Sequence, residues 1–234
     1  ETNNGNKDGF LTKYSSDGTK VWTKLIGTSS EERSYSVDTA SDGSVYITGY
    51  TDGDLDGETN NGGDSDGFLS KYSSDGTKVW TKIIGTSSED VSYNVDTASD
   101  GSIYITGYTD GDLDGETNNG NKDGFLTKYS SDGTKVWTKL IGTRKIDQSF
   151  NIATSSNGSA VYITGYTDGD LDGETNNGNE DGFLTKYSSD GTKIWTKLIG
   201  TSSEDIPLGI AVAIDGSVFI TGYTDGDLDG GTNA

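Results

Sequence analysis

A unit of 57 or 58 residues occurs four times along the chain, and this repeat constrains the fold more than any other feature. A Gly-Phe dipeptide marks each copy, at residues 9–10, 67–68, 124–125 and 182–183. Each copy continues with a segment containing lysine and tryptophan, a polar link, a tyrosine-containing segment and an acidic loop. A period of this length, built from short apolar stretches, is typical of propellers and related repeat arrays.

The chain begins and ends at the same point of the repeat. Residues 1–4 match residues 58–61, and residues 231–233 take the same place after the last copy. A linear solenoid needs distinct polar capping units, and the terminal copies show no such change in sequence. We therefore expect a closed ring and one domain over residues 1–234, with repeat units at about 8–65, 66–122, 123–180 and 181–234.

Each unit contains four predicted strands. In the first unit, residues 10–14 and 21–26 are rich in β-branched and aromatic side chains and flank an Asp-Gly turn. Residues 35–40 and 45–50 flank a second one. A short Asp-Gly turn between two such runs indicates a β-hairpin. Helix is disfavoured, because no segment keeps a 3.6-residue apolar period and each glycine in a helix interior costs about 0.5–1 kcal/mol.

Four strands in each of four units predict an all-β protein, a β-propeller of four four-stranded blades. Residues 36–51, SVDTASDGSVYITGYT, resemble the inner hairpin of SBBP-type bacterial β-propeller repeats and, more loosely, of NHL repeats. The resemblance covers all four units. It implies that the innermost strand of a blade comes first in the chain. The outer hairpin of residues 8–27 then joins the inner hairpin of residues 208–224 in one composite blade closed by strands from both termini.

Propellers of this kind usually have more than four blades. The sequence therefore leaves three arrangements open: a complete four-bladed ring, a segment of a larger ring, and an association of two chains.

The formal charge of −21 limits the partners of the chain. An acidic surface repels nucleic-acid phosphates and anionic membranes, so we expect neither as a partner. Membrane insertion is not expected either, since no window approaches about 20 consecutive apolar residues. The composition suits an extracellular or cell-surface protein, although the absence of cysteine leaves the compartment undecided.

Catalysis is not expected. The chain has no histidine and no cysteine, so it cannot form Ser-His or Cys-His arrangements. A near-symmetric ring also offers no unique cleft in which two carboxylates occupy different environments.

The acidic loop is the candidate metal site. In Asp52-Gly53-Asp54-Leu55-Asp56-Gly57, three carboxylates alternate with other residues and a glycine follows, as in the calcium loops of FG-GAP and dockerin-type repeats, which this motif resembles. Calcium takes six to eight oxygen ligands at about 2.3–2.6 Å, and glycine permits the sharp bend that such a loop needs. The predicted Ca²⁺ ligands are Asp52, Asp54, Asp56 and Asn60; Asp110, Asp112, Asp114 and Asn118; Asp168, Asp170, Asp172 and Asn176; and Asp225, Asp227, Asp229 and Asn233.

The alternative interpretation is that these loops are ordinary acidic turns, because aspartate and glycine are common turn residues. The loop also lacks the glutamate of an EF-hand at its twelfth position. The aspartates directly before the next Gly-Phe dipeptide are candidates for an additional ligand: Asp8, Asp66, Asp123 and Asp181.

We expect the four tryptophans, one per unit, to pack between blades. The tyrosine before each acidic loop, at positions 50, 108, 166 and 223, could instead face a sugar next to the ion. The sequence thus predicts a calcium-binding, non-catalytic structural or adhesive module that binds a protein or glycan surface, with multivalent contact through its repeats. A calcium-dependent lectin is the alternative, and a propeller enzyme domain a distant third.

Overall fold

The computed structural model describes residues 2–228. These residues form sixteen β-strands and contain no α-helix, so no helix within them could cross a membrane. The strands are β1 Gly9–Tyr14, β2 Lys20–Ile26, β3 Glu32–Thr39, β4 Val45–Thr51, β5 Asp66–Tyr72, β6 Lys78–Ile84, β7 Asp90–Thr97, β8 Ile103–Thr109, β9 Asp123–Tyr129, β10 Lys135–Ile141, β11 Asp147–Thr154, β12 Ala160–Thr167, β13 Asp181–Ser188, β14 Lys193–Ile199, β15 Asp205–Val212 and β16 Val218–Thr224.

The predicted Asp-Gly hairpins are confirmed. In the β1–β2 turn, the backbone nitrogen of Ser15 donates to the carbonyl of Thr19 at 2.9 Å, and the Asp17 carboxylate accepts from the Thr19 nitrogen at 2.9 Å. Gly18 has a φ of 85°, in the left-handed region that an L side chain rarely adopts. The same geometry recurs in the β5–β6 and β9–β10 turns.

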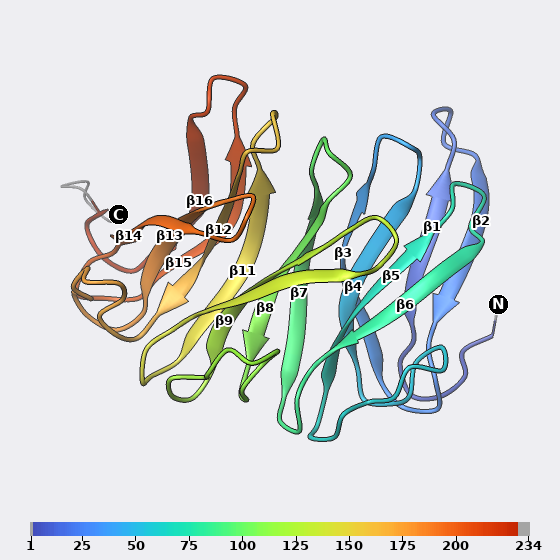
Figure 1. The fold of residues 1–234 in the computed structure, drawn as a ribbon, viewed down its shortest axis with the longest axis horizontal. Helices are drawn as coiled ribbons and strands as arrows, with labels where there is room; N and C mark the ends of the chain where they lie inside the picture. The colour runs from blue at the N-terminus through green and yellow to red at the C-terminus, as the bar shows by residue number, and fades with distance from the viewer. Residues whose placement is uncertain (1, 229–234) are drawn as a thin grey trace.

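Three four-stranded antiparallel sheets form the middle of the molecule, in the orders β3-β4-β5-β6, β7-β8-β9-β10 and β11-β12-β13-β14 (Figure 1). Each of these blades takes its first two strands from one repeat unit and its last two from the next. The strand order inferred from the resemblance is therefore confirmed within the complete blades. The first strands β3, β7, β11 and β15 contact one another in succession, which places them on the same side of the array.

The two ends of the array are half-blades. The strands β1 and β2 form a two-stranded sheet, and β15 and β16 form another. Figure 1 shows these hairpins at opposite ends of the long axis of the molecule. The composite blade expected from both termini is therefore not formed in this structure: the described residues build an open array, in which the two hairpins are too far apart to pair.

The core lies between successive blades. Phe68, Phe125 and Phe183, from the Gly-Phe dipeptides, are fully buried in three separate apolar clusters. Three of the four tryptophans pack between blades as predicted, because the indole rings of Trp22, Trp80 and Trp137 lie against glycines in the outer turn of the next blade.

A backbone contact fixes the first strand pair of each blade. The register shifts by one residue in this pair, between Ser92 and Asn94 in β7. A Cβ atom on Gly107 would lie 1.9 Å from the carbonyl oxygen of Val91, so only glycine fits there. Gly49, Gly165 and Gly222 occupy the same place in the other units.

Candidate metal centre

The first three acidic loops are structured connections between the second and third strands of a blade. In the first complete blade, the loop leaves β4 after Thr51 and enters β5 at Asp66. Leu55 in its middle is buried. Asp56 has a φ of 59°, a left-handed conformation that aspartate tolerates better than most residues. The buried Leu55 side chain therefore attaches the middle of the loop to the apolar core.

The aspartates of this loop hydrogen-bond to separate parts of the chain. Asp52 Oδ1 accepts from Ser65 Oγ at 2.7 Å. Asp54 Oδ1 accepts from the backbone nitrogen of Asn60 at 2.9 Å, and Asn60 itself donates from Nδ2 to the Thr51 carbonyl at 3.2 Å. The first two predicted ligands thus stabilise the turn.

The third aspartate of the loop faces the outermost strand. Asp56 forms an ion pair with Lys78 and accepts from Thr81 Oγ1 at 2.6 Å. The next two loops repeat the pattern, with Asp112 and Asp170 on the backbone of Asn118 and Asn176, and with Asp114 and Asp172 on Lys135 and Lys193. Of the last predicted set, Asp225 and Asp227 are described, whereas Asp229 and Asn233 lie outside the described residues.

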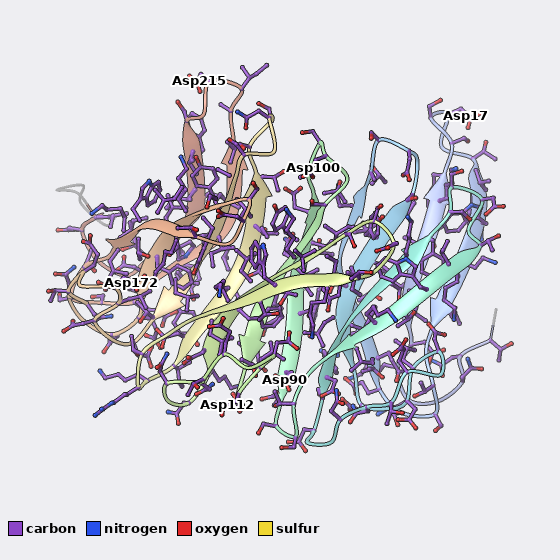
Figure 2. All side chains as sticks on the ribbon, viewed as in Figure 1. Asp17, Asp90, Asp100, Asp112, Asp172 and Asp215 are labelled. Atoms are coloured by element: carbon purple, nitrogen blue, oxygen red, sulfur yellow. The ribbon has the colours of Figure 1, made fainter. Side chains whose placement is uncertain are left out.

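The structure does not bring the three carboxylates of a loop together. Within residues 2–228, no group of three or more acidic side chains is arranged around a common point. Figure 2 shows Asp90 and Asp112 at one end of the sheets, and Asp17, Asp100 and Asp215 in hairpin turns at the other. The end that carries the loops also carries a second, buried set of acids.

This second set consists of inter-blade carboxylate pairs. One member is the first residue of the third strand of a blade, and the other is the first residue of the next blade. The backbone nitrogen of Asp90 donates to the carbonyl of Ser65 at 2.8 Å, so Asp90 lies beside Asp66. The three inter-blade carboxylate pairs are Asp66 with Asp90, Asp123 with Asp147, and Asp181 with Asp205.

Each carboxylate in these pairs uses one oxygen and leaves the other without a partner. Asp66 Oδ2 accepts from the backbone nitrogen of Asn61 at 2.6 Å, and Asp90 Oδ2 accepts from the Thr86 nitrogen at 2.6 Å. The Oδ1 atoms of both residues are buried and have no hydrogen-bond partner, and both residues are 0% exposed. The Thr109 hydroxyl interacts with the Asp90 carboxyl and lowers its pKa, and it also donates to the Gly111 carbonyl at 3.0 Å. The same orphaned oxygens occur in all six residues.

Burial and mutual repulsion disfavour the ionised form of both carboxylates in a pair. Burial, with a contribution from the charge of Asp66, raises the pKa of Asp90 to about 6. Burial and the charge of Asp147 likewise raise the pKa of Asp123 to about 6. An unpaired buried carboxylate is costly, and opposite charge nearby removes that cost. A cation beside such a pair would therefore stabilise the ionised carboxylates.

The first carboxylate of each pair packs against a glycine directly after the outermost strand of its blade, where no larger side chain fits. A Cβ atom on Gly85 would lie 2.3 Å from Asp66 Oδ1, and Gly142 and Gly200 stand in the same relation to Asp123 and Asp181. Ser92, two residues after Asp90, has a buried hydroxyl without a hydrogen-bond partner, over Gly67. Two carboxylates and a hydroxyl are hard oxygen donors of the kind that calcium prefers.

The repeats supply natural variants of this arrangement. At the N-terminal end, Glu32 takes the place of Asp90, and both of its oxygens are occupied, for example by Thr28 and Thr51 at 2.6–2.8 Å. In the last pair, Pro207 takes the place of Ser92, over Gly182. The four copies are therefore not equivalent.

The tyrosines proposed for sugar contact are engaged elsewhere. Tyr108 is buried, and its pKa is raised by burial and by a hydrogen bond to Glu89. The Tyr50 hydroxyl donates to Glu31 at 2.8 Å, and the Tyr50 ring packs against Tyr35 with 5.9 Å between centroids. Tyr35, Tyr93 and Phe150 continue this contact from blade to blade, at 5.4 Å between centroids. These rings link the first strands of the blades.

Sequence reasoning named Asp66, Asp123 and Asp181 as candidate additional ligands but did not name the residues that lie beside them, Asp90, Asp147 and Asp205. A signal was present. The first residue of the inner hairpin is acidic in all four units, while the residue before it changes from glutamate to isoleucine in the third.

Comparisons with known proteins agree with the repeat architecture. Residues 79–114, 136–172 and 194–229 match the family described as SBBP beta-propeller repeat. The chain is also 32% identical over 254 residues to the regulatory protein FlaEY of Caulobacter vibrioides, an alignment that covers 95% of this chain and 26% of FlaEY. The chain thus spans about a quarter of that relative.

A solved structure of a protein of unknown function from Bacteroides caccae aligns with 79% of this chain and 73% of its own, at 11% identity and a TM-score of 0.36.

Each of the three segments that match the SBBP family begins in the outermost strand of one blade, continues through the first two strands of the next blade and ends in the acidic loop that follows. The matches therefore recur with the period of the sequence repeat. These three segments of the chain are therefore SBBP β-propeller repeats.

Proposed function

We propose that this chain is a calcium-binding, non-catalytic interaction module, in which Ca²⁺ binds at the inter-blade carboxylate pairs. The observation that carries the proposal is the buried, unpartnered Oδ1 atom on each member of three pairs. Each ion would be held by Asp66 and Asp90, or by their counterparts, with the Ser92 hydroxyl or its counterpart where one is present. Because each pair joins two blades, the ion would stiffen the array.

The predicted DxDxDG ligand set is a competing version of the same function. In those loops, a calcium ion would have to displace Lys78 from Asp56 and the Asn60 nitrogen from Asp54. At the inter-blade carboxylate pairs it displaces no hydrogen bond of the orphaned oxygens. This difference favours the pairs.

The proposed location is the cell surface or the medium. A calcium site with only two carboxylates carries little negative charge, so we expect it to bind calcium weakly. Weak calcium sites, with Kd values of about 10⁻⁴–10⁻³ M, are typical of extracellular modules. The proposed partner is a protein or glycan surface, contacted through several repeats at once. The name of FlaEY, a regulatory protein, is compatible with a role in binding.

The half-blades belong to the same proposal. The two terminal hairpins of one chain do not pair in this structure. In the proposed assembly, each terminal hairpin would be completed to a four-stranded blade by a hairpin of the opposite kind. This completion removes the unpaired strand edges that an open array exposes.

Thermal unfolding with millimolar calcium, and again with excess chelator, tests the calcium proposal. Ligand that binds only the folded chain adds RT ln(1 + [L]/Kd), which is about 0.4–1.4 kcal/mol per site when calcium is present at one to ten times Kd. Asp90→Asn combined with Asp147→Asn should abolish most of the calcium response and raise the midpoint in chelator, because it removes buried charge.

The matched control is Asp54→Ala combined with Asp112→Ala, which removes loop carboxylates and keeps the pairs. It should respond to calcium like the parent. A response lost in the control and kept in the Asp90 and Asp147 variant would assign the ion to the loops. A parent without any calcium response would overturn both versions.

A further inference from the structure

The two half-blades expose the apolar residues that complete blades bury. Phe10 in β1 is 67% exposed, whereas its counterparts Phe68, Phe125 and Phe183 are 0% exposed. Tyr14 in β1 is 59% exposed, against 4% for Tyr72. The hairpin β1–β2 therefore carries the side chains of a blade interior on an open face.

The other half-blade contains the matching hollow. A groove beside β15 and β16 is lined by Ile199, Ile206, Pro207, Ile220, Gly222 and Leu228, among others. In a complete blade, the counterparts of Ile199, Ile220 and Leu228 are Ile141, Ile163 and Leu171. These three pack in one cluster with Phe183 and Tyr187 of the third strand. The groove is thus a blade interior that lacks its third strand.

The missing strand has the sequence of β1. In the complete blades, β4 pairs with β5 so that Ile47 faces Ser70 and Gly49 faces Phe68. The pairs β8–β9 and β12–β13 keep this register. Transferred to the ends of the array, the same register sets Ile220 opposite Thr12 and Gly222 opposite Phe10.

We propose that β16 of one copy of this chain pairs with β1 of a second copy, completing a blade between molecules. The occupant is a second copy, because the groove fits the side chains of β1 and the chain's own β1 lies at the opposite end of the array (Figure 1). Phe10 and Tyr14 of one copy then fill the groove of the next. The contact is head-to-tail, so repetition builds a ring or a filament. It needs no calcium at the interface.

Engineered cysteines test the pairing directly, because the chain has none of its own. A Thr12→Cys copy is mixed with an Ile220→Cys copy under mild oxidation, and a Lys13→Cys copy with a Phe219→Cys copy. Facing residues alternate between closely and widely spaced pairs along an antiparallel ladder, so one of the two mixtures has cysteines at disulfide distance. We expect a cross-linked dimer of unlike copies from at least one mixture. Thr12→Cys mixed with Ile214→Cys is the control, since Ile214 lies in the β15–β16 turn and faces no partner strand.

A chain that carries both Thr12→Cys and Ile220→Cys separates the two ways to complete the blade. Cross-linked multimers support pairing between copies. A disulfide formed only within single chains overturns the proposal in favour of ring closure by one chain, and no disulfide in any mixture overturns it as well.

Sedimentation of the parent chain over a range of concentrations gives an independent readout. Burial of a phenylalanine is worth about 1.5–3 kcal/mol, so Phe10→Asp should weaken self-association at least about tenfold. Ile214→Asp, at a residue that is 92% exposed outside the groove, should leave it unchanged. A parent that stays monomeric at every concentration contradicts the proposal.

Discussion

The complete blades and the terminal half-blades have nearly the same sequence but opposite exposure. In β9, Phe125 is fully buried; in β1, Phe10 follows the same glycine and precedes the same leucine, yet most of its surface is open. The strand sequence therefore fixes hairpin formation, while burial depends on the neighbouring strand. This is the behaviour of a repeat array, where stability comes from repeats and from the interfaces between them.

The largest expected difference between these regions concerns the Gly-Phe dipeptides. Phe125→Ala should lower the free energy of unfolding by about 3–5 kcal/mol, because it leaves a cavity between blades. Phe10→Ala should change it by less than about 0.5 kcal/mol in dilute solution. Urea unfolding at low protein concentration measures both. An equal loss for Phe10→Ala would mean that the N-terminal hairpin is covered in solution.

The glycine at the register shift provides a second comparison. Gly107→Ala forces a Cβ atom against the Val91 carbonyl and should cost about 1–3 kcal/mol. Gly222→Ala meets the Ile206 carbonyl in the same way, at 2.0 Å, but in a half-blade. It should lower global stability less and mainly speed hydrogen exchange in β15 and β16. Equal global losses would show that the half-blade unfolds together with the complete blades.

The inter-blade carboxylate pairs predict an unusual pH dependence in the absence of calcium. Folded Asp90 keeps its proton up to about pH 6, whereas the ordinary aspartate pKa is 3.8. The folded state thus binds more protons between these values, and the stability contributed by this group falls as the pH rises from about 4 to about 6. In chelator, Asp90→Asn should flatten this fall. A parallel pH profile for the variant would contradict the raised pKa.

The turn carboxylates predict the opposite and smaller trend. Hydrogen bonds from Ser73 and Thr77 lower the pKa of Asp75 to about 2, and those from Ser15 and Thr19 do the same for Asp17. Their contribution is therefore present above about pH 4 and is lost as the pH falls towards 2. Asp75→Asn should remove a small part of the acid sensitivity. Asp17→Asn, in the half-blade, should remove less, as followed by the unfolding midpoint at pH 2–5.

Much of the fold could be predicted from the sequence, because hairpins depend on local residues. The Asp17-Gly18 and Asp42-Gly43 turns specify their strand pairs directly. The order of the strands within a blade followed from the resemblance. The sequence could not reveal that β1 and β16 stay apart, since identical repeats fit a closed ring and an open array equally well.

The candidate site was less predictable, because it joins residues from different blades. The motif at Asp52, Asp54 and Asp56 is local and easily read, yet its carboxylates turn towards separate partners. The inter-blade pairs lie 24 residues apart in sequence, as Asp66 and Asp90 show, and only the packing of blades brings them together.

The offset between repeat and blade affects how such a gene can change in length. Each complete blade takes two strands from one repeat and two from the next. Duplication or deletion of one whole repeat at any boundary therefore leaves every complete blade with an inner and an outer hairpin. Recombination between the near-identical copies can thus lengthen or shorten the array in single steps of 57 or 58 residues.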